Sequence, residues 1–222
     1  SSGKYRMLYR NWKMPLSSQS LDTPYIEPLG VLPTSGAVPY VRDHNGTVQI
    51  LSASGNRYNS EIASLALVNE AGGYYPQRFS TGQYQMEYLF RIHPYLECDQ
   101  ELCHWNLMLA NEHLPYRQIA IYIHDPDELI VELFTHPQLR TQKEGEIWVI
   151  TGGSPKDELI EVEMLLLPQT ANIIEGFSRE VSNVYQRTVS AQEGEGSILL
   201  FLLRSLVAAL PLLLILVYLL IG

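Results

Sequence analysis

The chain has 222 residues, of which 15 are Lys or Arg and 24 are Asp or Glu, so its formal net charge is -9. This acidic balance argues against binding to nucleic acid, because proteins that contact phosphates normally carry a basic patch. It also argues against attachment to an anionic lipid surface by charge, since like charges repel.

Residues 1–40 hold five prolines and show little hydrophobic periodicity. The prolines are Pro15, Pro24, Pro28, Pro33 and Pro39. Proline fixes φ and lacks a backbone N–H, so it is disfavoured inside regular helices and central strands. We therefore expect residues 1–40 to be an extended segment that wraps along the rest of the protein, not a domain of its own.

Residues 41–168 contain three segments in which apolar and polar side chains alternate, as in strands. The repeating apolar positions are Tyr84, Met86, Tyr88, Phe90 and Ile92, then Ile119, Ile121 and Ile123, then Ile160, Val162, Met164 and Leu166. Weaker strand patterns cover residues 47–52, 63–69, 104–109, 129–134 and 146–151, with turn residues between them. Short strands at this spacing predict a mainly β fold, an antiparallel β-sandwich.

Two groups of carboxylates lie in this region. Glu161 and Glu163 are two residues apart in the third strand pattern, so they share a face, which we interpret as its solvent-exposed face. Residues 125–128 (DPDE) offer carboxylates that suit calcium, but a solvated turn between two strands is the simpler interpretation.

Cys98 and Cys103 are the only cysteines, and they lie in a polar stretch. An even, closely spaced pair predicts a disulfide formed in an oxidising compartment. The nearby residues His93, His104 and His113 keep a zinc site open as an alternative, although C-x4-C without a second cysteine pair is a poor zinc template. The haem-attachment pattern C-x-x-C-H has a shorter spacing than the one found here.

Residues 169–197 form an amphipathic segment followed by a linker. The apolar residues are Ile173, Ile174, Phe177, Val181, Val184 and Tyr185. Their spacing favours a helix between residues 172 and 188, while the β-branched content leaves a strand as an alternative. Residues 192–196 (QEGEG) then predict a short flexible link.

Residues 198–221 predict one transmembrane helix. Only Arg204 and Ser205 interrupt this apolar run, and about 20 apolar residues are enough to cross the hydrocarbon core. We expect Arg204 to reach the membrane interface and Pro211 to be tolerated against neighbouring helices. We also expect more protein to follow Gly222.

The bulk of the chain is expected on the extracytoplasmic side. Asn45-Gly46-Thr47 is an N-glycosylation sequon in a turn-like context, so Asn45 is a glycosylation candidate. The predicted disulfide between Cys98 and Cys103 points to the same side of the membrane.

The sequence offers no motif for catalysis. There is no G-x-S-x-G elbow, no phosphate loop and no dinucleotide fingerprint. We therefore assign no catalytic, cofactor or metal residue and expect the protein not to be an enzyme. Trp105 and Trp148 are candidates for stacking on a sugar if the sandwich binds carbohydrate.

Four short segments resemble the YciQ-like predicted membrane proteins, a bacterial and archaeal family. Residues 9–16 (YRNWKMPL) are similar to its R-x-I-P-L opening, residues 84–88 (YQMEY) to its Y-x-I-x-Y strand, residues 101–106 (ELCHWN) to its E-L-x-W-N step, and residues 117–121 (RQIAI) to the strand that follows. The resemblance covers residues 5–168. It implies a β-sandwich ectodomain followed by transmembrane helices, and it supplies no catalytic residue.

These observations predict a membrane-anchored extracytoplasmic interaction module that is a subunit of a larger membrane or cell-surface assembly. Its expected partners are the lipid bilayer and other membrane protein subunits or copies of itself, with no nucleic acid. A ligand- or carbohydrate-sensing ectodomain is the first alternative, and an extracytoplasmic hydrolase is the second. A buried pair of carboxylates, or a serine next to a histidine in a cleft, would favour the hydrolase.

Overall fold

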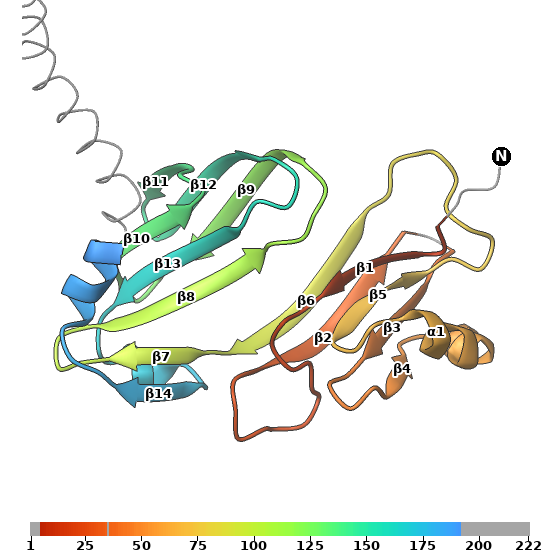
Figure 1. The fold of residues 1–222 in the computed structure, drawn as a ribbon, viewed down its shortest axis with the longest axis horizontal. Coiled ribbons are helices and arrows are strands. Elements are labelled where there is room, and N and C mark those ends of the chain that lie inside the picture. Colours follow the sequence, from red (N-terminus) through yellow and green to blue (C-terminus); the bar gives the residue numbers. More distant parts are fainter. Residues whose placement is uncertain (1–4, 35, 192–222) are drawn as a thin grey trace, which may run out of the picture. The chain divides into compact units, whose positions relative to one another are not determined.

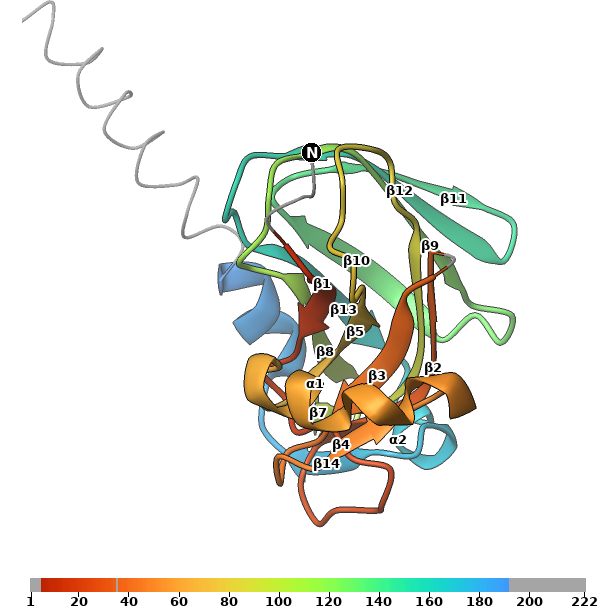
Figure 2. The ribbon, with the colours of Figure 1, turned by 90° about the vertical axis from the view of Figure 1, so that its right-hand side faces the viewer.

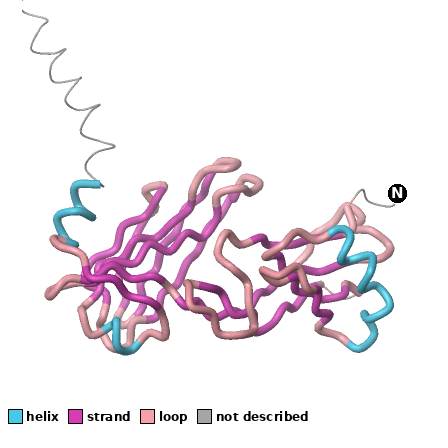
Figure 3. The backbone as a smooth tube through the Cα atoms, turned by 60° about the horizontal axis from the view of Figure 1, so that its bottom comes forward, coloured by secondary structure: helices cyan, strands magenta, loops and turns pink. Residues whose placement is uncertain are grey.

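The structure, a computed structural model, describes residues 5–34 and 36–191, which form a mainly β protein with several antiparallel sheets (Figure 1). Helix is confined to short segments (Figure 3). The chain divides into two compact units: unit 1 is Ser1–Leu96 with Ala171–Ser178, and unit 2 is Glu97–Thr170 with Arg179–Gly222. Residues 41–168 thus contribute to both units, and the sandwich arrangement stays a prediction.

Unit 1 contains a four-stranded sheet and a separate strand pair. The sheet has the order β1 (Met7–Asn11), β5 (Glu70–Tyr74), β3 (Val38–Arg42) and β4 (Val48–Ile50), and the pair joins β2 (Tyr25–Pro33) to β6 (Met86–His93). A 3-10 turn, Ala53–Tyr58, leads into helix α1 (Asn59–Leu65), which lies against β4 (Figure 2).

The N-terminal 40 residues differ from the expected wrapping segment, because they supply β1, β2 and part of β3. Pro28 and Pro33 lie within β2, which pairs only with β6 among the described strands. The register between β2 and β6 shifts between Pro28 and Gly30. Proline is accepted in edge strands and at bulges, because a ladder hydrogen bond is not needed there.

The alternation at residues 84–92 is confirmed by β6. Tyr88 and Phe90 turn inward and meet the ring of Trp12 edge-on, with centroids 6.0 and 5.8 Å apart. The buried residues of this core are Trp12, Leu16, Ile26, Val31, Val41 and Ala71.

The strand expected at residues 63–69 is wrong. Helix α1 covers the first part of this range, and β5 starts after it. Ile62 and Ala66, four residues apart, are both buried with Tyr40 and Tyr74 in a second core. Ile62 lies in α1 and Ala66 caps its C-terminal end, where Ala66 N donates a hydrogen bond to Ile62 O at 2.8 Å. This helical spacing overrides the strand pattern of the neighbouring residues.

Unit 2 holds most of a five-stranded sheet and all of a three-stranded one. The first has the order β10 (Ile130–His136), β13 (Ile160–Leu166), β8 (Cys103–Ala110), β7 (Tyr95–Cys98) and β14 (Phe177–Glu180). The second has the order β11 (Arg140–Glu144), β12 (Ile147–Ser154) and β9 (Tyr116–His124). The strand predictions at residues 104–109, 119–123, 129–134, 146–151 and 160–166 are confirmed.

The segment after β13 is not the single helix expected between residues 172 and 188. It forms α2 (Thr170–Ile173), strand β14 and a second helical stretch at residues 184–191. Gly176 lies between α2 and β14, where the chain passes close to Pro94. A Cβ at this position would lie 2.8 Å from both Cδ and O of Pro94. The chain is held extended there by a hydrogen bond from Phe177 N to Pro94 O, 2.8 Å long.

The predicted membrane span at residues 198–221, with Arg204 and Pro211, lies outside the described residues and stays a prediction. Within residues 5–34 and 36–191, no helix combines the length and the apolar character that a membrane crossing needs.

Candidate functional site

Cys98 and Cys103 form a disulfide at the turn end of the β7–β8 hairpin, where they are paired across the two strands. A disulfide leaves neither sulfur as a thiolate, and zinc and haem attachment both require free thiols. The zinc and haem alternatives therefore do not apply to the oxidised protein.

The histidines near these cysteines do not gather around them. His93, in unit 1, stacks on Tyr25 at a centroid distance of 4.1 Å. His113 stacks on Tyr116 at 4.5 Å. His104 instead faces Glu163 on the neighbouring strand. Each of these three histidines thus has its own neighbours, and among them only His104 contacts a carboxylate within unit 2.

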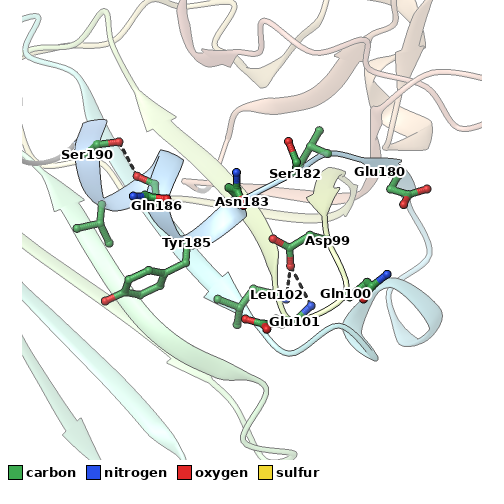
Figure 4. A pocket seen from close by; sticks show the side chains of 12 residues that line it. Asp99, Gln100, Glu101, Leu102, Glu180, Ser182, Asn183, Tyr185, Gln186 and Ser190 are labelled. Atoms are coloured by element: carbon green, nitrogen blue, oxygen red, sulfur yellow. Dashed lines mark hydrogen bonds between the residues drawn. The ribbon is translucent and has the colours of Figure 1, made fainter.

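Asp99 joins the disulfide hairpin to the helical residues 184–191. Its Oδ1 accepts hydrogen bonds from the backbone N–H groups of Glu101 and Leu102, each 2.9 Å long (Figure 4). Its Oδ2 accepts a hydrogen bond from Val184 N at 2.8 Å, where the helical stretch begins. The backbone N–H groups of Leu102, Val184 and Glu101 lower the pKa of Asp99, because they favour the charged carboxylate.

Further contacts hold the same segment on the hairpin. Val181 N donates to Cys98 O at 2.8 Å, and Glu97 pairs with Arg179 and, at 3.5 Å, with Arg187. The exposed ion pairs contribute little stability alone. A cavity of about 740 Å³ lies between the hairpin and residues 180–190 (Figure 4).

Glu161 and Glu163 are not on a solvent-exposed face, so that prediction is wrong. Their exposed fractions are 8% and 9%, and every residue of β13 is buried. β13 lies between β10 and β8, so both of its edges are paired. The alternation in sequence placed the two side chains on one face, but the covering of that face depends on segments distant in sequence.

A histidine from each flanking strand approaches Glu163. His104 Nε2, on β8, lies 3.1 Å from Oε2, and His136 Nε2, on β10, lies 3.7 Å from Oε1. The ligand atoms of His136, Glu161 and Glu163 all lie within 4.8 Å of one another. Residues from three adjacent strands therefore bring two imidazoles and two carboxylates together.

This cluster opens into a cavity of about 940 Å³. His136, Glu161 and Glu163 line it together with Glu158, residues 133–135, residues 137–139, Thr141, Leu159 and Ala191. Ala191 belongs to the helical stretch that precedes the predicted span. The cluster is thus accessible to a small ligand, and the cavity also reaches the helical residues 184–191.

Sequence reasoning did not find this cluster. The sequence pattern gives His136 no role and predicts a solvent-exposed face for the two glutamates. The signal lies in the antiparallel register, where His136 is paired with Glu161 and Leu165 with His104. That register joins β10, β13 and β8, which are distant in sequence, and it was not predictable from any one strand.

The calcium alternative at residues 125–128 is not supported by the geometry. Asp125 is buried, and its Oδ1 and Oδ2 accept hydrogen bonds from Leu129 N at 2.7 Å and Ile130 N at 3.0 Å. Both oxygens therefore stabilise the turn. The turn between two strands is confirmed, but Asp125 itself is buried.

The remaining candidates are separate from the cluster. Trp148 and Trp105 are half-buried, and Lys143 Nζ lies 5.3 Å from the centroid of the Trp148 ring. Asn45 is exposed in the β3–β4 turn, where Asp43 Oδ1 accepts hydrogen bonds from Asn45 N and Thr47 N. Glycosylation of Asn45 stays a prediction.

A comparison with known families gave one match. A family model described as "Predicted membrane protein (DUF2207) N-terminal domain" matches residues 2–166. No curated protein and no solved structure matches the chain. The matched range covers most of the chain and includes all four segments from which a predicted membrane protein family was inferred, although the narrower YciQ-like assignment stays a prediction. The chain therefore belongs to the DUF2207 predicted membrane protein family, of which residues 2–166 are the N-terminal domain.

Proposed function

We propose that this chain is the extracytoplasmic part of a membrane protein and acts as a non-enzymatic interaction module within a larger membrane or cell-surface assembly. In this proposal residues 198–221 anchor it in the bilayer. Its partners are other membrane protein subunits or further copies of itself, and nucleic acid is not among them. The Cys98–Cys103 disulfide supports an oxidising compartment for the body of the chain.

One observation carries the proposal. The disulfide hairpin holds Val181 and Val184 through Cys98 and Asp99, in the segment that precedes the predicted short link and span. A module attached in this way keeps unit 2 close to its anchor instead of leaving it on a long flexible tether. Such an attachment suits a subunit that presents a surface to neighbours in the same membrane.

Unit 1 offers a surface for such contacts. Leu29, Leu32 and Leu89 are exposed on the β2–β6 strand pair. Exposed apolar side chains grouped on one surface are typical of sites that contact another protein. We expect this strand pair to meet a partner subunit.

The test is gentle detergent extraction of the native membrane, followed by size separation and mass spectrometry of the proteins that co-migrate with the chain. Stoichiometric co-migration supports the proposal. The double variant Leu32→Ser/Leu89→Ser should lose the partner, while Leu114→Ser, a leucine exposed in the β8–β9 loop, should retain it. A wild-type chain that migrates alone contradicts the proposal.

A second candidate is a ligand-sensing ectodomain, which is favoured by the cavity at β10 and β13. Buried carboxylates beside imidazoles bind cations or move protons, and Ala191 links the cavity wall to the segment before the predicted span. The same side chains would serve an extracytoplasmic hydrolase. Turnover of ester, peptide or glycoside substrates that is lost in Glu163→Gln would support that alternative over sensing.

A further inference from the structure

The cluster at β10, β13 and β8 has the donor atoms of a metal site. Metal-bound nitrogen and oxygen atoms lie about 2.0–2.2 Å from zinc, so neighbouring ligand atoms are ~3–4 Å apart. His136 Nε2 and Glu163 Oε1 are 3.7 Å apart, and Glu161 contributes an oxygen within 4.8 Å of both. Small side-chain rotations therefore suffice to place all three around one ion.

Glu161 gives an independent reason to expect a cation. Glu161 is more than nine-tenths buried and lines the cavity, and within the described part of the chain its carboxylate has no hydrogen bond or ion pair. A buried carboxylate without a compensating partner is costly, because it has lost its water. A cation in the cavity would compensate its charge.

His104 is suited to a positioning role. Its Nε2 lies 3.1 Å from Glu163 Oε2, while Oε1 of the same carboxylate faces His136. When His104 Nε2–H donates a hydrogen bond to Oε2, Oε1 remains directed towards the ion. Outer hydrogen bonds of this kind orient metal ligands in proteins.

The donor set indicates the class of ion. One imidazole with two carboxylates suits divalent transition metals such as zinc, whereas calcium and magnesium prefer oxygen alone. The disulfide removes both thiols of the chain, so a soft thiolate site is excluded in the oxidised protein. The cavity leaves room for water or a small ligand at the remaining coordination positions.

We propose that His136, Glu161 and Glu163 bind one divalent transition-metal ion of the zinc class at the β10–β13 strand pair, and that His104 positions Glu163. This inference deepens the ligand-sensing candidate and is independent of membrane assembly. Because Ala191 lines the same cavity, we expect ion binding to affect the helical residues 184–191, which precede the predicted span.

The test is calorimetric titration of Zn²⁺ into the full chain in detergent, stripped with a chelator and carrying no polyhistidine tag. We expect one ion per chain. Glu161→Gln and His136→Ala should weaken binding at least tenfold, and His104→Ala should weaken it about 10–100-fold. The matched controls Glu132→Gln, on β10, and His124→Ala, at the end of β9, should bind as the wild type does.

A second measurement does not depend on the variants folding. Co²⁺ added to the wild-type chain should give visible absorption bands of nitrogen and oxygen ligation, and Zn²⁺ should displace them. Failure of the wild type to bind Zn²⁺ or Co²⁺, or unchanged affinity in folded Glu161→Gln and His136→Ala, overturns the proposal. Co-migration with membrane partners is a separate measurement, so failure of the assembly role and failure of the metal site are distinguishable.

Discussion

The hydroxyl of Tyr40 donates a hydrogen bond to Oε1 of Glu70, and both side chains are almost fully removed from solvent inside unit 1. The other oxygen, Oε2, accepts a hydrogen bond from Leu67 N at 3.0 Å. Burial raises the pKa of Glu70, although these two hydrogen bonds and the charge of Arg42 oppose the rise. Tyr40 and Glu70 thus join β3 to β5 through a polar contact in the core.

The raised pKa of Glu70 predicts a pH-dependent stability. The Glu70 carboxyl holds its proton more tightly in the folded chain than in the unfolded chain. Protonated Glu70 therefore contributes its full stabilisation below about pH 4.5, and this stabilisation is lost as the pH rises through the pKa of the folded state. Glu70→Gln cannot titrate. We expect the difference in unfolding free energy, wild type minus Glu70→Gln, to fall as the pH is raised from 4.5 in urea titrations.

Glu87→Gln, on the exposed face of β6, is the matched control and should show no such trend. A wild-type minus Glu70→Gln difference that is constant between pH 4 and pH 8 would contradict the prediction. Tyr40→Phe removes one hydrogen bond from the buried carboxyl and should destabilise the protein by ~1–3 kcal/mol.

Gly72 is required by the close approach of β1 to β5. A Cβ at this position would lie 2.4 Å from Leu8 O and 2.8 Å from Tyr9 Cα, and backbone atoms cannot move aside as a flexible side chain can. We expect Gly72→Ala to destabilise the protein by ~1–3 kcal/mol through overpacking. The midpoint of urea unfolding measures this change.

Gly82→Ala is the control for that substitution, because its Cβ would meet no atom closer than 3.8 Å. It should leave the midpoint nearly unchanged. Equal midpoints for Gly72→Ala and the wild type would show that β1 does not approach β5 this closely.

Asp99 should stabilise the helical structure of residues 184–191. Asp99→Ala removes the acceptor for Val184 N, and the loss of such a capping interaction typically costs ~0.5–2 kcal/mol. We expect faster hydrogen exchange at Val184 and Arg187, with Asp127→Asn, in an exposed turn, as the control. Unchanged exchange at both amides would exclude a capping role.

The lowered pKa of Asp99 gives the same contact a pH dependence of opposite sign to that of Glu70. Its contribution is present above the ordinary value of 3.8 and is lost as the pH falls through the lower, folded pKa. In wild-type protein, the protection of Val184 should therefore weaken at acidic pH after correction for the intrinsic exchange rate. Asp99→Ala should lack this change.

The disulfide should stabilise unit 2. Closing a loop this short constrains the unfolded chain by roughly 2 kcal/mol, so Cys98→Ser/Cys103→Ser should lower the free energy of unfolding by about that amount. Reduction of the wild type should have the same effect and should not change the double variant. A double variant as stable as the oxidised wild type would contradict the prediction.

Much of the strand content is predictable from the sequence, because apolar and polar side chains alternate between neighbouring residues of each strand. β6, β9 and β13 each show a period of two, and the structure confirms all three. The helix α1 was missed because Ile62 and Ala66 are a sparse helical signal beside a stronger apolar run. The strands within the first 40 residues are not evident from the sequence, because proline usually argues against a strand. Pro28 and Pro33 nevertheless lie in β2, which pairs only with β6 among the described strands, and Pro39 lies in β3.

By itself, the sequence determined the mainly β class, the strands with clear alternation and the close cysteine pair, because each depends on residues near one another in the chain. Only the tertiary structure decided that Glu161 and Glu163 are buried and that His104 and His136 lie beside them. The register of β8, β13 and β10 sets these distances, and it results from packing between segments far apart in sequence. The charges of Glu161 and Glu163 therefore predicted a solvent-exposed strand face, while the fold places both carboxylates in the wall of a cavity.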